Sequence, residues 1–312
     1  MIEDSEIKTK TSPFAIREGE IKVFDGKDGY VSMNQIIQKI NVGHINDLHF
    51  RIMELVNEFE FITSRQLFQL LSKEDFDIKS QDKLNNKLEQ LVKTKILTRY
   101  YFNSEDGKGI YRIYCLEKMG KYLLNSRGVE CNWQPTDNTK TVPMIKKRLA
   151  SNQTLIAYKD KVHAFNGYEV RATMRAKALG KTFKTTGPKI TLSIQGRSLD
   201  FIFEIVRREE DWENKLKDRM KLYKDFYTNF APMDSGFRNI PQLIIQCEDE
   251  RHTAESFKVI IMNDLVPPKM NLYYTTDLRQ NAPNLEQSLI EFKLDEQSNK
   301  YKMENPTIKI LG

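Results

Sequence analysis

The chain has 312 residues, of which 39% are hydrophobic and 29% charged, as is ordinary for a globular protein with room for two domains. It contains no run of 18 apolar residues and begins with polar residues, so we expect no transmembrane helix, no signal peptide, no membrane partner and a cytoplasmic location. The three cysteines and four histidines are too scattered for a disulfide framework or a zinc site. No metal or other cofactor is therefore expected from them.

Positive charge is concentrated in one segment. The net charge is only +6, yet the segment from Lys140 to Lys189 carries twelve basic residues against Asp160 and Glu169. Such a field attracts polyanions, and we predict phosphate contacts from Lys146, Lys147, Arg148, Arg171, Arg175, Lys177, Lys181 and Lys184. The alternative is a solvated linker with a basic bias.

Residues 1–45 are predicted to form an extension with a hairpin around Asp28-Gly29. Helical periodicity then begins near His49, and Ile52, Leu55, Val56 and Phe59 share one face. A second helix follows in FITSRQLFQLL, where Thr63 and Gln66 form a capping box. A third lies in SQDKLNNKLEQLVKTKIL, with an apolar stripe of Leu84, Leu88 and Leu91. The runs LTRYYF and IYRIYCL, separated by Asp106-Gly107 and Gly109, predict a hairpin.

This order of three helices and a hairpin predicts a winged-helix domain over residues 46–128, with the third helix as the recognition helix. Its exposed amides and amines suit base edges and phosphates. The predicted DNA contacts are Lys79, Gln81, Lys83, Asn85, Asn86 and Lys87, with Lys108 in the hairpin loop. Alternatively, the domain contacts only proteins.

Residues 129–145 contain Pro135 and Pro143 and are predicted to be a linker. Residues 146–312 open with a helix in VPMIKKRLASNQTLIAYKDKV, and the stretch from Tyr168 to Lys181 is expected to be a helix or a helix-turn-strand transition. Strand-like runs then alternate with helices: ITLSI, SLDFIFEIV, DWENKLKDRMKLYKDFY, PQLIIQC, ESFKVIIMNDL and NLYYTT. This alternation predicts an α/β sheet covered by helices.

Several short signatures, in this order, resemble the replication-relaxation family of plasmid and mobile-element proteins. They are FITSRQLFQLL, LVKTKILTRYYF, GIYRIYCLEKMGKYLL, FIFEIVRREEDW, PQLIIQCEDERHTAESFKVI and NLYYTTDL. The resemblance extends from about Arg51 to Thr276. It implies an α+β chain in which a winged helix precedes a degenerate restriction-endonuclease-like domain of the PD-(D/E)xK type.

The resemblance implies a position in a nuclease-like site for Glu204, an acid inside the apolar run FIFEIV. Nucleases of this fold hold a divalent metal with two carboxylates and use a nearby lysine. Glu204 matches the strand acid, but Val206 stands where the lysine would be, and Pro188-Lys189 replaces Pro-Asp. Arg219, four residues before Tyr223, matches the family's helix lysine. The site is therefore expected to be stripped of its metal.

Two other acids could rebuild a catalytic site. Asp200 lies four residues before Glu204, about 13 Å away along a strand, and Glu169 could join from a preceding helix. Such a site would take Mg²⁺ or Mn²⁺. Alternatively, Glu204 is a structural acid paired with Arg207, Arg219 or Lys221, or it contributes to binding DNA or a partner.

We therefore expect a sequence-recognising protein that binds double-stranded DNA, belongs to a plasmid or other mobile genetic element, and acts in replication, mobilisation or their regulation. Its nuclease-like domain would be an inactive scaffold for DNA or homodimer contacts. One alternative is a metal-dependent enzyme that nicks or relaxes DNA. The other is a transcriptional repressor that dimerises through its C-terminal half.

Overall fold

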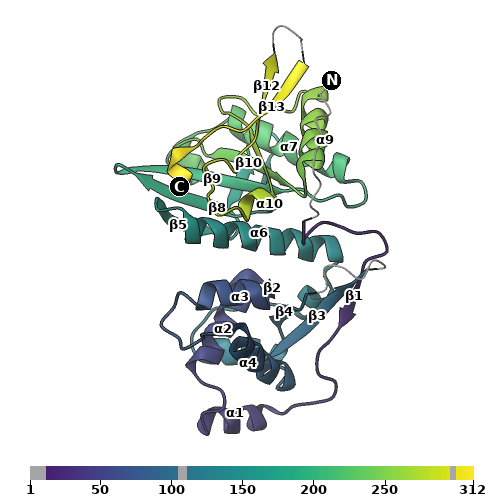
Figure 1. Cartoon of the computed structure of the whole chain (residues 1–312), viewed down its shortest axis with the longest axis vertical. Coiled ribbons are helices and arrows are strands. Elements are labelled where there is room, and N and C mark those ends of the chain that lie inside the picture. The colour runs from purple at the N-terminus through teal and green to yellow at the C-terminus, as the bar shows by residue number, and fades with distance from the viewer. Residues whose placement is uncertain (1–11, 105–110, 296–299) are drawn as a thin grey trace. The chain divides into compact units, whose positions relative to one another are not determined.

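A computed structural model describes residues 12–104, 111–295 and 300–312, and its architecture is mixed α+β, as expected (Figure 1). The chain divides into two compact units. Unit 1 contains residues 12–16 and Ala150–Gly312, and unit 2 contains Arg17–Leu149. In the described residues, no helix combines the length and the apolar character needed to cross a membrane.

Unit 2 combines helices with an antiparallel sheet. The helices are α1 (Met33–Asn41), α2 (Asp47–Phe59), α3 (Ser64–Leu71), α4 (Gln81–Lys93) and α5 (Lys118–Ser126), followed by a 3-10 turn at Pro135–Thr139. The strands are β1 (Ile21–Phe24), β2 (Ile62–Thr63), β3 (Leu97–Asn103) and β4 (Ile113–Leu116), in the order β1-β3-β4-β2.

The predicted helix patterns of unit 2 are confirmed. The apolar face of α2 is buried, as is the leucine stripe of α4. Thr63 and Gln66 form the capping box of α3. Strands β3 and β4 pair as the predicted hairpin, whereas its turn residues Asp106, Gly107 and Gly109 and the predicted DNA contact Lys108 lie outside the described residues.

The predicted hairpin around Asp28-Gly29 is wrong. Strand β1 instead pairs antiparallel with β3, bringing Phe24 opposite Tyr100, and their rings meet edge to face with centroids 5.9 Å apart. The carboxylate of Asp25 then pairs with the guanidinium of Arg99 at 2.8 Å. These contacts with a distant strand outweigh the local turn signal.

Unit 1 is built on a mixed sheet in the order β11-β10-β9-β8-β5. Its strands are β5 (Phe165–Glu169), β8 (Lys189–Ile194), β9 (Arg197–Ile205), β10 (Gln242–Cys247) and β11 (Tyr273–Thr276). Strands β9, β10 and β11 run parallel, and β5, β8 and β9 run antiparallel. Two further hairpins are β6 (Thr173–Ala176) with β7 (Lys181–Lys184), and β12 (Glu291–Asp295) with β13 (Lys300–Glu304).

Helices cover both faces of this sheet. Alternate residues of β9 point to opposite faces. Ile202 and Val206 join a core with α7 (Trp212–Thr228) and α9 (Glu250–Met262). Phe203 points the other way and meets Tyr158 of α6 (Val142–Lys161), with ring centroids 5.5 Å apart. The short helices α8 (Pro232–Ser235) and α10 (Asp277–Gln280) and a 3-10 turn at Lys309–Leu311 complete unit 1.

The predicted helix between Tyr168 and Lys181 is wrong, because this stretch forms the end of β5, then β6 and the start of β7. Ala172, Met174 and Ala176 are buried, whereas Thr173 and Arg175 between them are exposed. That alternation has the period of a strand. The inward side chains join the core against α7, which fixes the hairpin on that helix.

Gly187 is required where the chain enters β8. A Cβ atom there would lie 2.7 Å from Phe203 Cβ and 2.9 Å from the Phe203 carbonyl oxygen. Because the backbone of a central strand cannot move away freely, we expect Gly187→Ala to lower the free energy of unfolding by about 1–3 kcal/mol. Denaturant unfolding measures this loss.

Gly167→Ala is the matched control, because a Cβ atom on Gly167 of β5 would meet nothing within 4 Å. We expect it to change stability by less than about 0.5 kcal/mol. Equal losses in the two variants would contradict the close approach of Gly187 to Phe203.

Candidate functional site

Helix α4 of unit 2 has one buried and one exposed face. Ser80 caps its start by accepting a hydrogen bond from the backbone of Lys83, and Leu84, Leu88 and Leu91 anchor it in the core. On another face lie Lys83, Asn86, Lys87 and Gln90. Their spacing of three, four and seven residues places these two amines and two amides side by side.

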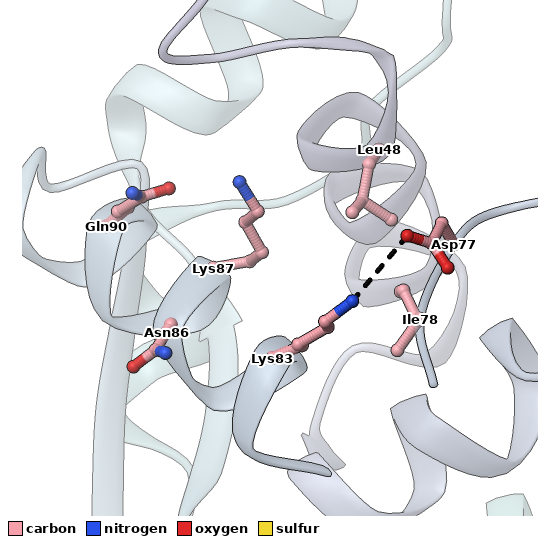
Figure 2. A pocket seen from close by; sticks show the side chains of 7 residues that line it. All are labelled: Leu48, Asp77, Ile78, Lys83, Asn86, Lys87 and Gln90. Atoms are coloured by element: carbon pink, nitrogen blue, oxygen red, sulfur yellow. Dashed lines mark ion pairs between the residues drawn. The ribbon is translucent and has the colours of Figure 1, made fainter. Parts of the chain in front are cut away.

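These four side chains line an open pocket of about 400 Å³ together with Leu48 of α2, Asp77 and Ile78 (Figure 2). Lys83 pairs with Asp77 at 3.6 Å, which ties α4 to the loop before it. Asn86 and Gln90 are exposed at the pocket. The pocket therefore offers amide and amine hydrogen-bond donors beside a small apolar floor.

His49 positions Gln90, a contact that the sequence analysis did not identify. Its Nε2 lies 2.8 Å from Gln90 Oε1, and its Nδ1 accepts from the backbone of Asn46 at 3.2 Å. The Nδ1 atom also lies 2.8 Å from Asn46 Oδ1, so a neutral ring can donate either to Asn46 Oδ1 or to Gln90 Oε1. Burial lowers the pKa of His49 below its ordinary value and favours the neutral ring, which donates to Gln90 when its proton is on Nε2. That hydrogen bond uses the Gln90 amide oxygen, so the Gln90 amide nitrogen can donate to another group. Gln90 could have been found from its helical spacing to Lys83 and Asn86.

Other side chains predicted to contact DNA through this helix make local contacts. Gln81 donates to the Ser64 carbonyl and to Asn85 Oδ1, both at 3.2 Å, so Gln81 and Asn85 support each other beside the pocket rather than line it. Lys79 is exposed and pairs with Asp77 at 3.4 Å.

The basic segment separates into buried and exposed charges. Lys146 is 1% exposed and pairs with Glu20, and Arg148 is buried and lies 3.5 Å from Glu60. Both side chains are therefore paired with glutamates inside unit 2. The prediction that they contact phosphates is wrong for this reason. Lys147 is half-buried.

The remaining basic residues of this segment lie on or beside the β6–β7 hairpin. Arg175, Lys181 and Lys184 are exposed, and Arg171 is half-buried. Lys177 pairs with Asp234 at 2.6 Å. The hairpin thus presents a basic outer surface, although one of its charges is already paired.

Glu204 is buried near the C-terminal end of β9, in a cluster of hydrogen bonds. Arg219 of α7 donates to both carboxylate oxygens, at 2.9 and 2.8 Å, and the Tyr223 hydroxyl donates to one of them at 2.7 Å. Of the three expected partners, Arg219 is confirmed, whereas Arg207 pairs with Asp277 and Lys221 with Asp218. Burial, with the Glu204 charge beside it, raises the pKa of Tyr223 well above its ordinary value. Tyr223 therefore acts as a hydrogen-bond donor.

The other two candidate catalytic acids make separate contacts. Asp200 accepts from the Thr191 hydroxyl at 2.5 Å. Glu169 lies on strand β5, not on the expected helix, and pairs with Lys189 at 2.9 Å. Among the described residues, no group of three or more His, Cys, Asp or Glu side chains is arranged to hold a metal ion. Glu169, Asp200 and Glu204 are thus each engaged by a different partner.

Comparison of the chain with protein-family models, with curated proteins and with solved structures found no match.

We expect Glu204→Ala to destabilise unit 1 by roughly 3 kcal/mol, because it leaves the Arg219 guanidinium without its buried counter-charge. Denaturant unfolding measures the loss. Asp218→Asn is the control, since Asp218 pairs with Lys221 on the surface and its side chain is 74% exposed. A Glu204→Ala protein as stable as the control would contradict a structural role for the carboxylate.

The His49 contact predicts a pH dependence. The folded state keeps His49 neutral, whereas the unfolded chain binds a proton near pH 6.5. Its contribution to stability is therefore present above pH 6.5 and is lost as the pH falls below that value. We expect the free energy of unfolding to fall between pH 7.5 and pH 5.5, and to fall less in His49→Gln than in the unaltered protein. Replacement of the exposed His44 by Gln should leave the drop unchanged.

Proposed function

We propose that this chain is a sequence-recognising DNA-binding protein of a plasmid or other mobile genetic element, and that α4 reads the duplex. The observation that carries the proposal is the exposed face of Lys83, Asn86, Lys87 and Gln90 on a helix anchored by buried leucines. An α-helix fits the major groove of DNA, where base edges present distinct donors and acceptors.

The order of elements in unit 2 supports this proposal. Helices α2, α3 and α4, the short β2 and the β3–β4 hairpin follow one another as in a winged helix. In that arrangement α4 is the recognition helix and the hairpin is the wing. Double-stranded DNA is the partner in this proposal.

The amides of the α4 face suit base contacts, which give specificity, and its amines suit phosphate contacts, which give affinity. The amide of Asn86 can pair with the N6 and N7 atoms of an adenine, and the amide nitrogen of Gln90 can donate to a base acceptor such as N7. The amines of Lys83 and Lys87 can contact guanine or the phosphates, and phosphate contacts position the protein without reading sequence. His49 limits the orientations of Gln90, so that base contact is preorganised.

Unit 1 serves as an inactive, restriction-endonuclease-like scaffold in this proposal. The sequence resemblance to the replication-relaxation family and the sheet β5-β8-β9-β10 between α6 and α7 support it. The hydrogen bonds to both oxygens of Glu204 favour structure over catalysis. The exposed cations of the β6–β7 hairpin add phosphate contacts, and a homodimer would double the number of binding surfaces.

Selection of duplexes from a random pool by the full-length protein tests the proposal. We expect an enriched motif, and we expect Asn86→Ala and Gln90→Ala each to reduce discrimination at one position by about 1–3 kcal/mol. Asn125→Ala, a change of the same kind at an exposed position of α5, should leave the motif unchanged.

Replacement of Lys83 or Lys87 should change affinity for all duplexes and not the preference for one sequence. Lys83→Gln and Lys87→Gln should weaken binding to all duplexes and reduce the slope of log affinity against log salt by about 1 each. Lys93→Gln is the matched control on α4, because Lys93 is exposed and lies outside the pocket. If no motif is enriched, or if Lys93→Gln has the same effect as Lys87→Gln, recognition by this face of α4 is contradicted.

A further inference from the structure

A second, strongly polar pocket lies in unit 1 at the tip of the β8–β9 hairpin. It is open, and its volume is about 810 Å³. Its lining consists of Asn166, Ser193, Gly196, Arg197, Ser198, Arg238 and Asn239. Every one of these residues except Gly196 carries a hydroxyl, an amide or a guanidinium group. The pocket is therefore suited to a charged or highly polar ligand.

The hairpin turn positions three of these groups. Gln195 and Gly196 have φ values of 49° and 77°, and two successive residues with positive φ form a tight turn that matches the twist of the strands. The turn places Ser193 directly opposite Ser198, and Arg197 at the start of β9. Both hydroxyls thus lie on the same face of the hairpin. Arg197, one residue before Ser198, begins on the other face, and it also lines the pocket.

The second guanidinium group comes from the loop before β10. That loop is fixed to the hairpin because Asn239 Nδ2 donates to the Ser198 carbonyl at 3.2 Å. Arg238, the preceding residue, consequently lines the same pocket as Arg197. Two arginines that are 41 positions apart in the sequence are brought to one site.

The charge of the pocket is uncompensated. No acidic side chain lines it. Neither Arg197 nor Arg238 has an ion-pair partner among the described residues, and both are exposed. Asp200, the next acid along β9, is bonded to Thr191. The guanidinium groups of Arg197 and Arg238 can therefore both face an anionic ligand.

We propose that this pocket is a binding site for phosphate groups. Guanidinium groups form bidentate hydrogen bonds with phosphate oxygens, and serine hydroxyls and asparagine amides supply further donors. The phosphates belong either to the backbone of nucleic acid, a source that rests on the proposed DNA-binding function, or to a free phosphorylated compound. None of the residues that line it belongs to the α4 face or to the β6–β7 hairpin.

Calorimetric titration of the full-length protein with inorganic pyrophosphate at low ionic strength tests the site. We expect Arg197→Gln combined with Arg238→Gln to weaken pyrophosphate binding at least about tenfold. The corresponding double Lys substitution keeps the charge but loses the bidentate geometry, and its loss should be intermediate. Lys159→Gln with Lys258→Gln removes the same charge from exposed positions outside the pocket and should change affinity less than about twofold.

A second arm identifies the source of the phosphate. If it is the DNA backbone, the double Gln variant also binds short duplexes more weakly, with a salt slope reduced by about 2. If it is a free compound, duplex binding is unchanged while pyrophosphate binding falls. The site is overturned if the unaltered protein does not bind pyrophosphate, or if the arginine and lysine variants lose affinity equally. Failure of the unaltered protein to bind any duplex would count against the proposed function, and the pyrophosphate result would still stand.

Discussion

The carboxylate of Glu204 can be buried near the C-terminal end of β9 only because α7 supplies its partners. A lone ionised carboxylate in that position would cost several kcal/mol, and the guanidinium of Arg219 and the hydroxyl of Tyr223 offset this cost. Arg219 also donates to the Lys184 carbonyl of β7 at 2.8 Å, and Phe183 packs edge to face on Tyr223 with centroids 5.2 Å apart. One cluster therefore fixes strand, helix and basic hairpin together.

In unit 2 the corresponding constraint is the division of α4 into two faces. Its leucines are fully buried, so the helix cannot rotate without exposing them, and this fixes the direction of the adjoining polar face. The Ser80 cap and the Lys83–Asp77 ion pair fix the start of the helix, and His49 contacts Gln90 near its end. Under the proposed DNA-binding function, these contacts would lower the conformational entropy that the α4 face loses on binding.

The sequence predicted α2, α3 and α4 of unit 2 and the parallel strands of unit 1, because these carry strong periodic or continuous apolar patterns. Helix α1, inside the predicted N-terminal extension, was not predicted. The predictions were wrong where the secondary structure depends on contacts with residues distant in the sequence. Strand β1 depends on pairing with β3, and the strands between Tyr168 and Lys181 depend on packing against α7. Glu169 was assigned to a helix because its strand, β5, forms only by pairing with β8 further along the chain. The β12–β13 hairpin was not predicted either, although Phe292 stacks on Phe257 of α9 with centroids 4.1 Å apart.

The candidate sites show the same limit. Helical spacing was enough to find Lys83, Asn86 and Lys87, and Arg219 was one of three partners expected for Glu204. Charge counting could not separate Lys146, which is buried beside Glu20, from the exposed lysines of the β6–β7 hairpin. Nor could it bring Arg197 and Arg238 to one pocket, because that requires the turn at Gln195-Gly196 and the path of the loop before β10.

A supercoiled-plasmid assay, run with Mg²⁺ or Mn²⁺ and with EDTA, tests the central claim most directly. The DNA should carry a site selected by the full-length protein, and one gel reports both retardation and nicking. The account predicts a shifted band of intact supercoiled plasmid in every condition, at protein concentrations that leave a plasmid without the site unshifted. Open circles that appear only with metal and vanish in Glu204→Gln would contradict the structural role of Glu204, and no shift at all would contradict DNA recognition.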